Sequence, residues 1–310
     1  MTTLSVRPAS LDDADAVCVL LNDVDEIEVG RRETAVGEIL AEWKHPEVDL
    51  RRDSWLLHEN ERLVGYALLW DESGGERIDA DLFLLPGSAE ATRTLLELTE
   101  ARAVERAAAN GARRAVVHQG LHSNTTADQA VLRARGWRTV RRYHVLERAL
   151  SPAEDTMPEP LPGVCLRPCA DEADRRTVHA LLQESFAEHF DHQPRTYEQW
   201  LHDIDADHAD FSLIWIAREE SLGDVAAIRT RNDGIGTGWI SNLGVLRAAR
   251  GRGIAGYLLR YAFWYYAGLG RERIGLGVDT ENSTGAPALY ARHGMRPDCA
   301  VDTWEVIIPV

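Results

Sequence analysis

The sequence has little lysine and a shortage of basic charge. Lys44 is the only lysine, so nearly all basic side chains are arginines. The formal net charge of −16 disfavours a nucleic-acid partner, because a phosphate backbone binds a basic surface. An acidic protein suits a cationic substrate, and it also suits plain solubility, so charge leaves both readings open.

Long apolar runs and paired cysteines are also absent. No apolar run approaches the roughly 20 residues that a membrane helix needs, and the opening segment lacks the charged-then-apolar pattern of a signal peptide. We therefore expect a soluble cytoplasmic protein with no membrane partner. Four scattered cysteines, Cys18, Cys165, Cys169 and Cys299, do not make a disulfide scaffold, so we expect reduced structural thiols.

The chain resembles itself, which predicts two copies of one fold. Val6-Arg7-Pro8 returns 160 residues later as Leu166-Arg167-Pro168. Asn124-Thr125-Thr126 returns 158 residues later as Asn282-Ser283-Thr284. In each copy the first motif is followed by two aspartates, and the second by a glycine that ends a helical pattern; these are Asp12, Asp15 and Gly136, then Asp171, Asp174 and Gly294.

The segment between the copies, Ser151–Gly163, is rich in proline and acidic residues and has no strand or helix periodicity. We predict a first domain over 1–150, a linker over 151–163 and a second domain over 164–310. Each half mixes hairpins, such as Ser54–His58 with Leu63–Trp70, with strand–helix–strand crossovers. The expected fold class is therefore α/β, with a mixed, mostly antiparallel sheet flanked by helices in each domain.

The stretch Trp239–Arg260 organises the second half. It reads as a short apolar strand ending at Val245, a basic glycine-rich loop and an amphipathic helix. Glycines in such a loop let successive N–H groups converge on a phosphate, and a helix N-terminus favours an anion. The arginines can add charge. The expected pyrophosphate-binding residues are Arg250, Gly251, Arg252, Gly253, Ile254, Ala255 and Gly256.

The loop is followed at a fixed distance by a second motif. Leu243-Gly244-Val245 and Arg250–Ala255 are followed by Asn282, Ala286 and Leu289-Tyr290, and then by Gly294-Met295. At these residues the chain resembles the GCN5-related N-acetyltransferase (GNAT) superfamily. The repeat then implies two tandem GNAT-like domains, the first degenerate, in an intramolecular pseudo-dimer. The tandem layout and the length also resemble, more weakly, mycothiol synthase.

The resemblance assigns roles to individual residues. Acetyl-CoA would be the co-substrate, with its pantetheine arm along the strand edge from Leu243 to Val245 and in contact with Asn282. The N–H of Val245 would polarise the thioester carbonyl, and Tyr290 would protonate the departing thiolate. Such roles match the chemistry, because charge develops first on the carbonyl oxygen and then on sulfur. Taken alone, Tyr290 would equally suit the core of an amphipathic helix.

The general base has several candidates. Some relatives carry a glutamate at the position of Trp239, so that base is missing here. Acidic or histidine side chains that could replace it are Asp279 and Glu281 after the last strand of the loop region, and Glu184, Glu188 and His189 in the helical stretch expected over the acceptor. The histidines His189, His192, His202 and His208 lack metal-ligand spacing, so we expect polar or acceptor-site histidines and no metal.

The first half has lost the key residues. It reads Leu84-Leu85-Pro86-Gly87-Ser88 where the loop should be, and Glu90 would repel a phosphate. Leu132 takes the place of Tyr290, while Asn124 remains. We expect a non-catalytic first domain that helps wall the acceptor pocket.

Two functions from different classes compete. The first is an acetyl-CoA-dependent N-acetyltransferase that acts by direct transfer on a primary amine of a small molecule, for which we expect a cationic acceptor; a mycothiol synthase-like reaction is one form of it. The second is a non-catalytic acyl-CoA-binding regulatory module that kept the loop without turnover. Tyr290 and the open strand favour the enzyme.

Overall fold

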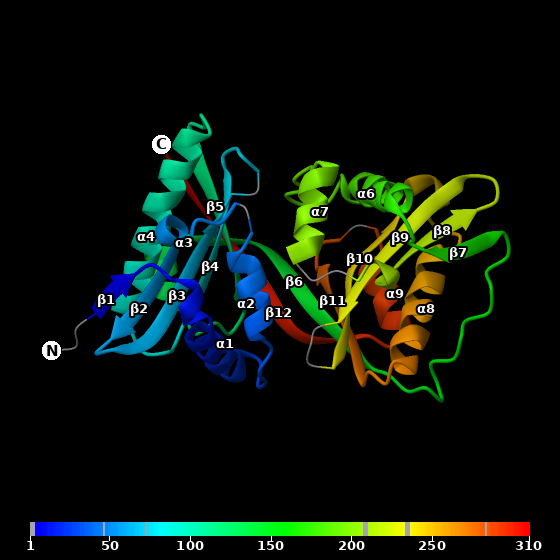
Figure 1. Cartoon of the computed structure of the whole chain (residues 1–310), viewed down its shortest axis with the longest axis horizontal. Coiled ribbons are helices and arrows are strands. Elements are labelled where there is room, and N and C mark those ends of the chain that lie inside the picture. The colour runs from blue at the N-terminus through cyan, green and yellow to red at the C-terminus, as the bar shows by residue number, and fades with distance from the viewer. Residues whose placement is uncertain (1–3, 46, 72, 207–209, 233–235, 283) are drawn as a thin grey trace. The chain divides into compact units, whose positions relative to one another are not determined.

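The strands form one 12-stranded sheet, and the part of it in each unit has helices on both faces (Figure 1). The computed structural model describes residues 4–45, 47–71, 73–206, 210–232, 236–282 and 284–310. Unit 1 comprises Met1–Tyr143 together with Cys299–Val310, and unit 2 comprises His144–Asp298.

Apart from short helices of three or four residues, the helices and strands follow one another in the same order in both halves. The first half contains β1 (Leu4–Arg7), η1 (Leu11–Asp13), α1 (Ala14–Glu28), α2 (Val36–Trp43), α3 (Leu50–Asp53), β2 (Ser54–Glu59), β3 (Arg62–Trp70), β4 (Arg77–Leu84), α4 (Ala89–Ala109), β5 (Arg114–His122), α5 (Gln129–Ala134) and β6 (Arg138–Ala149). The second contains β7 (Val164–Pro168), α6 (Glu172–Phe186), α7 (Tyr197–Ala206), η2 (Phe211–Leu213), β8 (Ile214–Glu219), β9 (Gly223–Asn232), β10 (Thr237–Val245), η3 (Arg247–Ala249), α8 (Ile254–Gly268), β11 (Arg273–Asp279), α9 (Ala286–Arg292) and β12 (Arg296–Pro309).

The parts of the sheet in the two units have matching topology. In unit 1 the strand order is β1-β2-β3-β4-β5-β12, and in unit 2 it is β7-β8-β9-β10-β11-β6. The first four strands of each part are antiparallel neighbours, whereas β4 with β5 and β10 with β11 are parallel pairs joined by a helical crossover. The α/β class and the mostly antiparallel sheets predicted from the sequence are confirmed.

The last strand in each unit comes from an unexpected part of the chain. Val301–Pro309 of β12 pairs antiparallel with Arg114–His122 of β5, and thus lies in unit 1. The segment of β6 from His144 onward belongs to unit 2. The units therefore differ from the contiguous halves 1–150 and 164–310. Unit 1 ends at Tyr143 and includes residues 299–310, and unit 2 begins at His144 and ends at Asp298. Alternation within β12 specifies a half-buried strand but not its partner, so the sequence pattern could not reveal this pairing.

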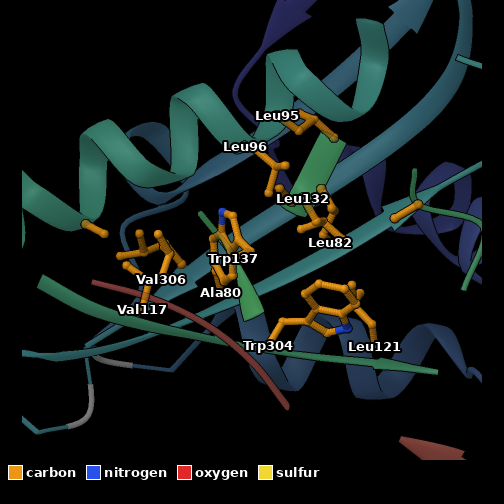
Figure 2. Packing of buried hydrophobic residues seen from close by; sticks show 14 of the residues in the cluster. Ala80, Leu82, Leu95, Leu96, Val117, Leu121, Leu132, Trp137, Trp304 and Val306 are labelled. Atoms are coloured by element: carbon orange, nitrogen blue, oxygen red, sulfur yellow. The ribbon is translucent and has the colours of Figure 1, made fainter. Parts of the chain in front are cut away.

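The sheet is packed on both faces in each unit. In unit 1, α4 covers the cluster shown in Figure 2, where Leu95 and Leu96 lie over Ala80 and Leu82 of β4. Trp304 of β12 is part of the same core and is 2% exposed, so the late strand is an integral part of unit 1. The opposite face packs against α1 and α2. In unit 2, α8 and α9 cover one face and α6 and α7 the other.

The repeated Arg-Pro motif has the same structural role in both units. Arg7 forms a forked ion pair with Asp13, with atom separations of 2.5 and 2.8 Å, and Arg167 is paired with Asp174. Each pair ties the first strand to the start of the first helix. In the first copy the partner is Asp13, rather than the Asp12 or Asp15 that the motif alignment singled out.

The segment 151–163 contains turns but no helix or strand, as its composition predicts. It is nevertheless anchored: Arg148 pairs with Asp155 at 2.8 Å, and Leu161 packs against the core of unit 2. All four cysteines are free. None of the helices in the described ranges is both long enough and apolar enough to cross a bilayer.

Candidate active site

The two central strands of unit 2 separate along their length. The parallel pairing of β10 with β11 runs from Thr237 with Arg273 to Ile240 with Leu276 and stops there. β10 nevertheless continues to Val245, paired on its other side with β9 as far as Val245 with Ala226. A gap therefore opens between the ends of β10 and β11, where the edge of β10 that faces away from β9 is not paired, from Asn242 onward, with any strand in the described ranges.

The backbone of β10 presents hydrogen-bond donors to this gap. The N–H of Leu246 donates to the carbonyl oxygen of Val225 at 2.8 Å. Because bonding directions alternate along an antiparallel strand, the N–H groups of Leu243 and Val245 point the opposite way, toward the gap. Both side chains are half-buried against the α8 core. This edge can pair with an extended, amide-bearing chain in the manner of an added strand.

A β-bulge marks the point where the strands separate. The register of β10 against β9 shifts between Ile240 and Asn242, so Ser241 is the extra residue. Its hydroxyl oxygen is buried and, within the described part of the chain, has no hydrogen-bond partner. A buried orphan hydroxyl is costly unless a ligand satisfies it. Sequence reasoning missed Ser241, because nothing in the local pattern signals a bulge.

The glycine-rich loop lies directly beyond β10, at the N-terminus of α8. Gly251 and Gly253 have φ values of +78° and +83°, a conformation that L side chains rarely adopt. Gly253 is the N-cap residue of α8, and its carbonyl oxygen accepts from the N–H of Tyr257 at 3.0 Å. Gly251, Arg252 and Gly253 are exposed, whereas Ile254 is 1% exposed and anchors the helix in the core. The loop thus leaves backbone donors accessible at a positive helix end.

The two loop arginines have partners within the protein. Arg250 donates from Nε to the carbonyl oxygen of Val245 at 3.1 Å and from a terminal nitrogen to that of Ser185 at 3.3 Å. Arg252 lies 3.6 Å from the carboxylate of Glu219. Arg250 therefore ties the loop to the end of β10 and to the end of α6. Because both arginine side chains have partners, most donors that the loop offers to a ligand are backbone N–H groups.

Close packing around the loop explains two further glycines. A Cβ on Gly256, in the first turn of α8, would lie 3.2 Å from the ring of His293 at the end of α9. A Cβ on Gly244 would overlap the Ser185 hydroxyl and lie 3.2 Å from Leu182. Helix α9 thus approaches α8 at Gly256, and α6 approaches β10 at Gly244, because neither glycine has a side chain. The half-buried Ala255 follows Ile254 on the same turn.

Tyr290 and Asn282 follow β11 in the chain. Tyr290 is on α9 and is 8% exposed, and burial raises the pKa of its phenol to about 12. It therefore keeps its proton at any physiological pH and can act only as a donor. The side-chain oxygen of Asn282 accepts from the N–H and hydroxyl of Thr284 at 2.8 and 2.6 Å, which shapes the turn into α9. Ser283 lies outside the described residues.

The equivalent gap in unit 1 is bridged by the chain itself. There β4 and β5 pair only from Arg77 to Asp79, but the Thr126 hydroxyl donates to the carbonyl oxygen of Leu84 at 2.5 Å. The Glu28 carboxylate accepts from the N–H of Thr126 at 2.6 Å, and Asn124 donates to the Glu28 carbonyl oxygen. The Leu84 carbonyl, Thr126 and Asn124 in unit 1 thus already have partners within the chain.

The loop and acid of unit 2 also have no counterparts in unit 1. The Ser88 side chain caps α4 by accepting from the N–H of Ala91 at 3.1 Å, so one of the free donors of that helix end is already used. Glu90 lies in the first turn of the helix. Leu132, at the position of Tyr290, is fully buried in the apolar core.

The candidate general bases differ in their exposure to solvent. Asp279 is 8% exposed at the end of β11 and accepts from the N–H of Glu281, whose own side chain is exposed. Glu184 and Glu188 are exposed. His189 is half-buried in the turn after α6. Among the residues described, no three His, Cys, Asp or Glu side chains come together in a way that could hold a metal ion, and His208 lies outside those residues.

The segment that contains the gap, the loop and the tyrosine matches a known family. Residues 175–295 match the model of the Acetyltransferase (GNAT) family. This stretch of unit 2 is a GNAT acetyltransferase domain. It belongs to an acyltransferase class that uses acyl-CoA as co-substrate, and the accessible donors of β10 and of the loop fit such a molecule.

Solved structures show that the GNAT likeness extends over the whole chain. A GCN5-related N-acetyltransferase from Sphaerobacter thermophilus has a TM-score of 0.80 at 24% identity, covering 99% of this chain and 96% of its own. A tandem GNAT protein from the clavulanic acid biosynthesis pathway has a TM-score of 0.72 at 14% identity, covering 98% of each chain.

A more distant likeness involves a larger acyl group. N-myristoyltransferase from Saccharomyces cerevisiae, with bound myristoyl-CoA, has a TM-score of 0.65 at 14% identity, covering all of this chain and 80% of its own. No curated protein matches the sequence. At these identities the structural neighbours establish the tandem GNAT fold.

Proposed function

We propose that unit 2 transfers an acetyl group from acetyl-CoA directly to a primary amine of a small molecule, and that unit 1 has no catalytic role. The observation that carries this proposal is the gap between β10 and β11. It combines N–H donors from Leu243 and Val245 with an exposed glycine loop at a helix N-terminus, inside the segment that matches the acetyltransferase family.

Binding would use backbone groups. The loop 250–256 would hold the pyrophosphate through N–H groups at the start of α8, and the edge of β10 would pair with the amide groups of the pantetheine arm. Asn282 uses its side-chain oxygen in a turn, so its amide donors are the part that would contact this arm. Ser241 would supply a further polar group at the bulge.

The chain's own groups would then serve the reaction in turn. When bound, acetyl-CoA supplies an activated acyl group, and the transfer needs no covalent enzyme intermediate. The Val245 N–H would stabilise negative charge on the carbonyl oxygen. Tyr290, held protonated by burial, would give its proton to the departing sulfur.

The acceptor side would be built by α6 and the turn after it, which lie against β10 at Gly244. The net charge of −16 supports a cationic acceptor. The mycothiol synthase-like alternative would use the cysteinyl amine of a sugar-linked thiol. Trp239 packs 2.8 Å from a Cβ position on Gly275, so an aromatic ring fills the position where some relatives have a glutamate.

Release of free thiol from acetyl-CoA, measured with a panel of amines, tests the proposal. The panel should hold cationic amines, an aminoglycoside, a cysteinyl sugar and a peptide N-terminus. We expect at least one small amine to raise thiol release well above the water background and to appear as its N-acetyl product by mass spectrometry. If acetyl-CoA binds by calorimetry but no amine accelerates release, the non-catalytic binding module is the better description.

A further inference from the structure

A transfer to an amine needs a group that takes up a proton. Trp239 occupies the position in β10 where some relatives carry a glutamate for this purpose. The proposed reaction therefore requires a base from another element. The turn after α6 carries His189, whose N–H donates to the carbonyl oxygen of Phe186 at 2.9 Å. Its ring packs on the Phe186 ring at a centroid distance of 4.5 Å. Backbone and ring contacts together fix the direction of the imidazole.

The end of α6 is held against one side of the gap. Gly244 lets Ser185 approach β10, and Arg250 bonds both the Ser185 and the Val245 carbonyl oxygens. Arg250 also contributes to the lowered pKa of His189, which follows Ser185 by four residues. The turn is thereby positioned relative to the donors of β10.

The other side of the gap also reaches His189. Asp279 ends β11, three residues beyond the last β10 pairing at Leu276, and is the largest charged influence on His189. Val278 packs in the α8 core, so alternation directs Asp279 to the opposite face, which α6 covers. His189 therefore lies in the turn that follows the end of α6 held against β10, and Asp279 ends β11 toward the face that α6 covers.

The surroundings keep this imidazole neutral. Burial lowers the pKa of His189, Asp279 opposes that effect, and Arg250 and His192 add to it. A neutral imidazole at pH 7 can accept a proton, whereas the carboxylate of Asp279 would stabilise the imidazolium that forms. Among the described residues, Asp279 on β11, Arg250 in the loop and His192 in the same turn affect the pKa of His189.

We propose that His189 is the general base that deprotonates the acceptor amine, and that Asp279 is the positioning residue that supports it. This assignment rests on the proposed function. The amine nitrogen bonds to the thioester carbonyl carbon and the carbon–sulfur bond breaks. An acceptor ammonium gives up two protons. One passes to His189 and then to solvent, and the other replaces the proton that Tyr290 gives to sulfur.

The pH dependence of turnover with the best amine of the panel tests the base. For the unmodified protein, kcat should be level between pH 7 and 8.5, because His189 is already neutral there. In His189→Gln we expect kcat to fall by about 10²- to 10³-fold at pH 7 and to rise steeply with pH over the same range. His202→Gln, which replaces an exposed histidine on α7, is the control and should keep the level profile.

Two further variants separate a chemical role from a structural one. Added imidazole should restore part of the turnover of His189→Ala, which a packing role would not allow. Asp279→Asn removes the charge that raises the pKa of His189, so the acid limb should move to lower pH. The acetyl-CoA Kd of all variants should stay within about twofold of the unmodified protein.

The possible failures are distinguishable. If the unmodified protein acetylates no amine, the proposed function fails. If it does so and His189→Gln retains both rate and level profile, the base assignment alone is overturned. A rate loss in His189→Ala with no imidazole rescue and an unchanged pH profile would also overturn it, in favour of packing.

Discussion

Arg250 donates from Nε to the carbonyl oxygen of Val245, five residues back in the chain, at 3.1 Å. The bond closes the loop onto the strand whose N–H groups face the gap, and the second bond to Ser185 brings in α6. One side chain thus couples the edge of β10, the glycine-rich loop and the end of α6.

Replacing Arg250 should therefore affect both substrates. In Arg250→Gln we expect the KM for acetyl-CoA and that for the amine each to rise by about three- to tenfold, because the loop and α6 lose their common tie. Arg252→Gln is the control: its 3.6 Å pair with Glu219 is half exposed, and such pairs contribute little. Equal effects of the two substitutions in steady-state kinetics would show that charge, and not the tie, matters.

The loop glycines should be essential for cofactor binding. Gly253→Asp places a carboxylate at a helix N-cap that faces the expected pyrophosphate, in a residue with φ of +83°. Calorimetry should show at least a tenfold loss of acetyl-CoA affinity. Gly87→Asp, also at positive φ before the corresponding helix of unit 1, should leave the affinity unchanged. A parallel loss in Gly87→Asp would assign binding to both units.

Tyr290 should act in turnover and not in binding. We expect Tyr290→Phe to lower kcat by about 10²-fold or more, with the Kd of acetyl-CoA unchanged, because only the proton donor is removed. Burial holds the pKa of Tyr290 near 12, so this group should add no loss of activity below pH 10. Tyr265→Phe on α8 is the control and should stay within twofold. An unchanged kcat in Tyr290→Phe would rule out the acid role.

Unit 1 should tolerate damage to its bridged gap without loss of catalysis. Thr126→Val removes hydrogen bonds to Leu84 and Glu28 and should cost about 1–3 kcal/mol of stability. Chemical denaturation measures that cost, while kcat should remain within twofold of the unmodified protein. A large fall in kcat with the protein still folded would contradict a non-catalytic unit 1.

A buried carboxyl in unit 1 should make stability fall at high pH. Burial, with Asp81 nearby, raises the pKa of Glu42 to about 8, and burial also raises the pKa of Asp81. Since the folded-state pKa is raised, the folded form binds protons that the unfolded chain releases, so stability is lost as pH rises from about 4.5 to 8. Glu42→Gln should raise the Tm by several degrees at pH 8 and leave it unchanged at pH 4.5. The exposed Glu26→Gln should show no such pH dependence.

Local sequence patterns predict much of the fold and of the candidate site. The duplication, the strand–loop–helix around Gly251 and Gly253, and the loss of a tyrosine at Leu132 are all visible in short stretches of sequence. The bulge at Ser241 and the placement of His189 near Asp279 are not, because they depend on how elements far apart in the chain pack. The partner of β12 is likewise decided by tertiary contacts that alternation cannot specify.

The origin of the last strand of unit 1 constrains how the protein is made. Residues 299–310 complete the sheet that begins at Leu4, so a ribosome must release them before the first unit can close. Until then, the edge of β5 that will pair with β12 stays unpaired while the acetyltransferase segment is translated. The second unit, by contrast, already has its own strand from His144 onward when its synthesis begins. Unit 2 can therefore fold first, and cutting the gene at the linker would deprive both products of a strand.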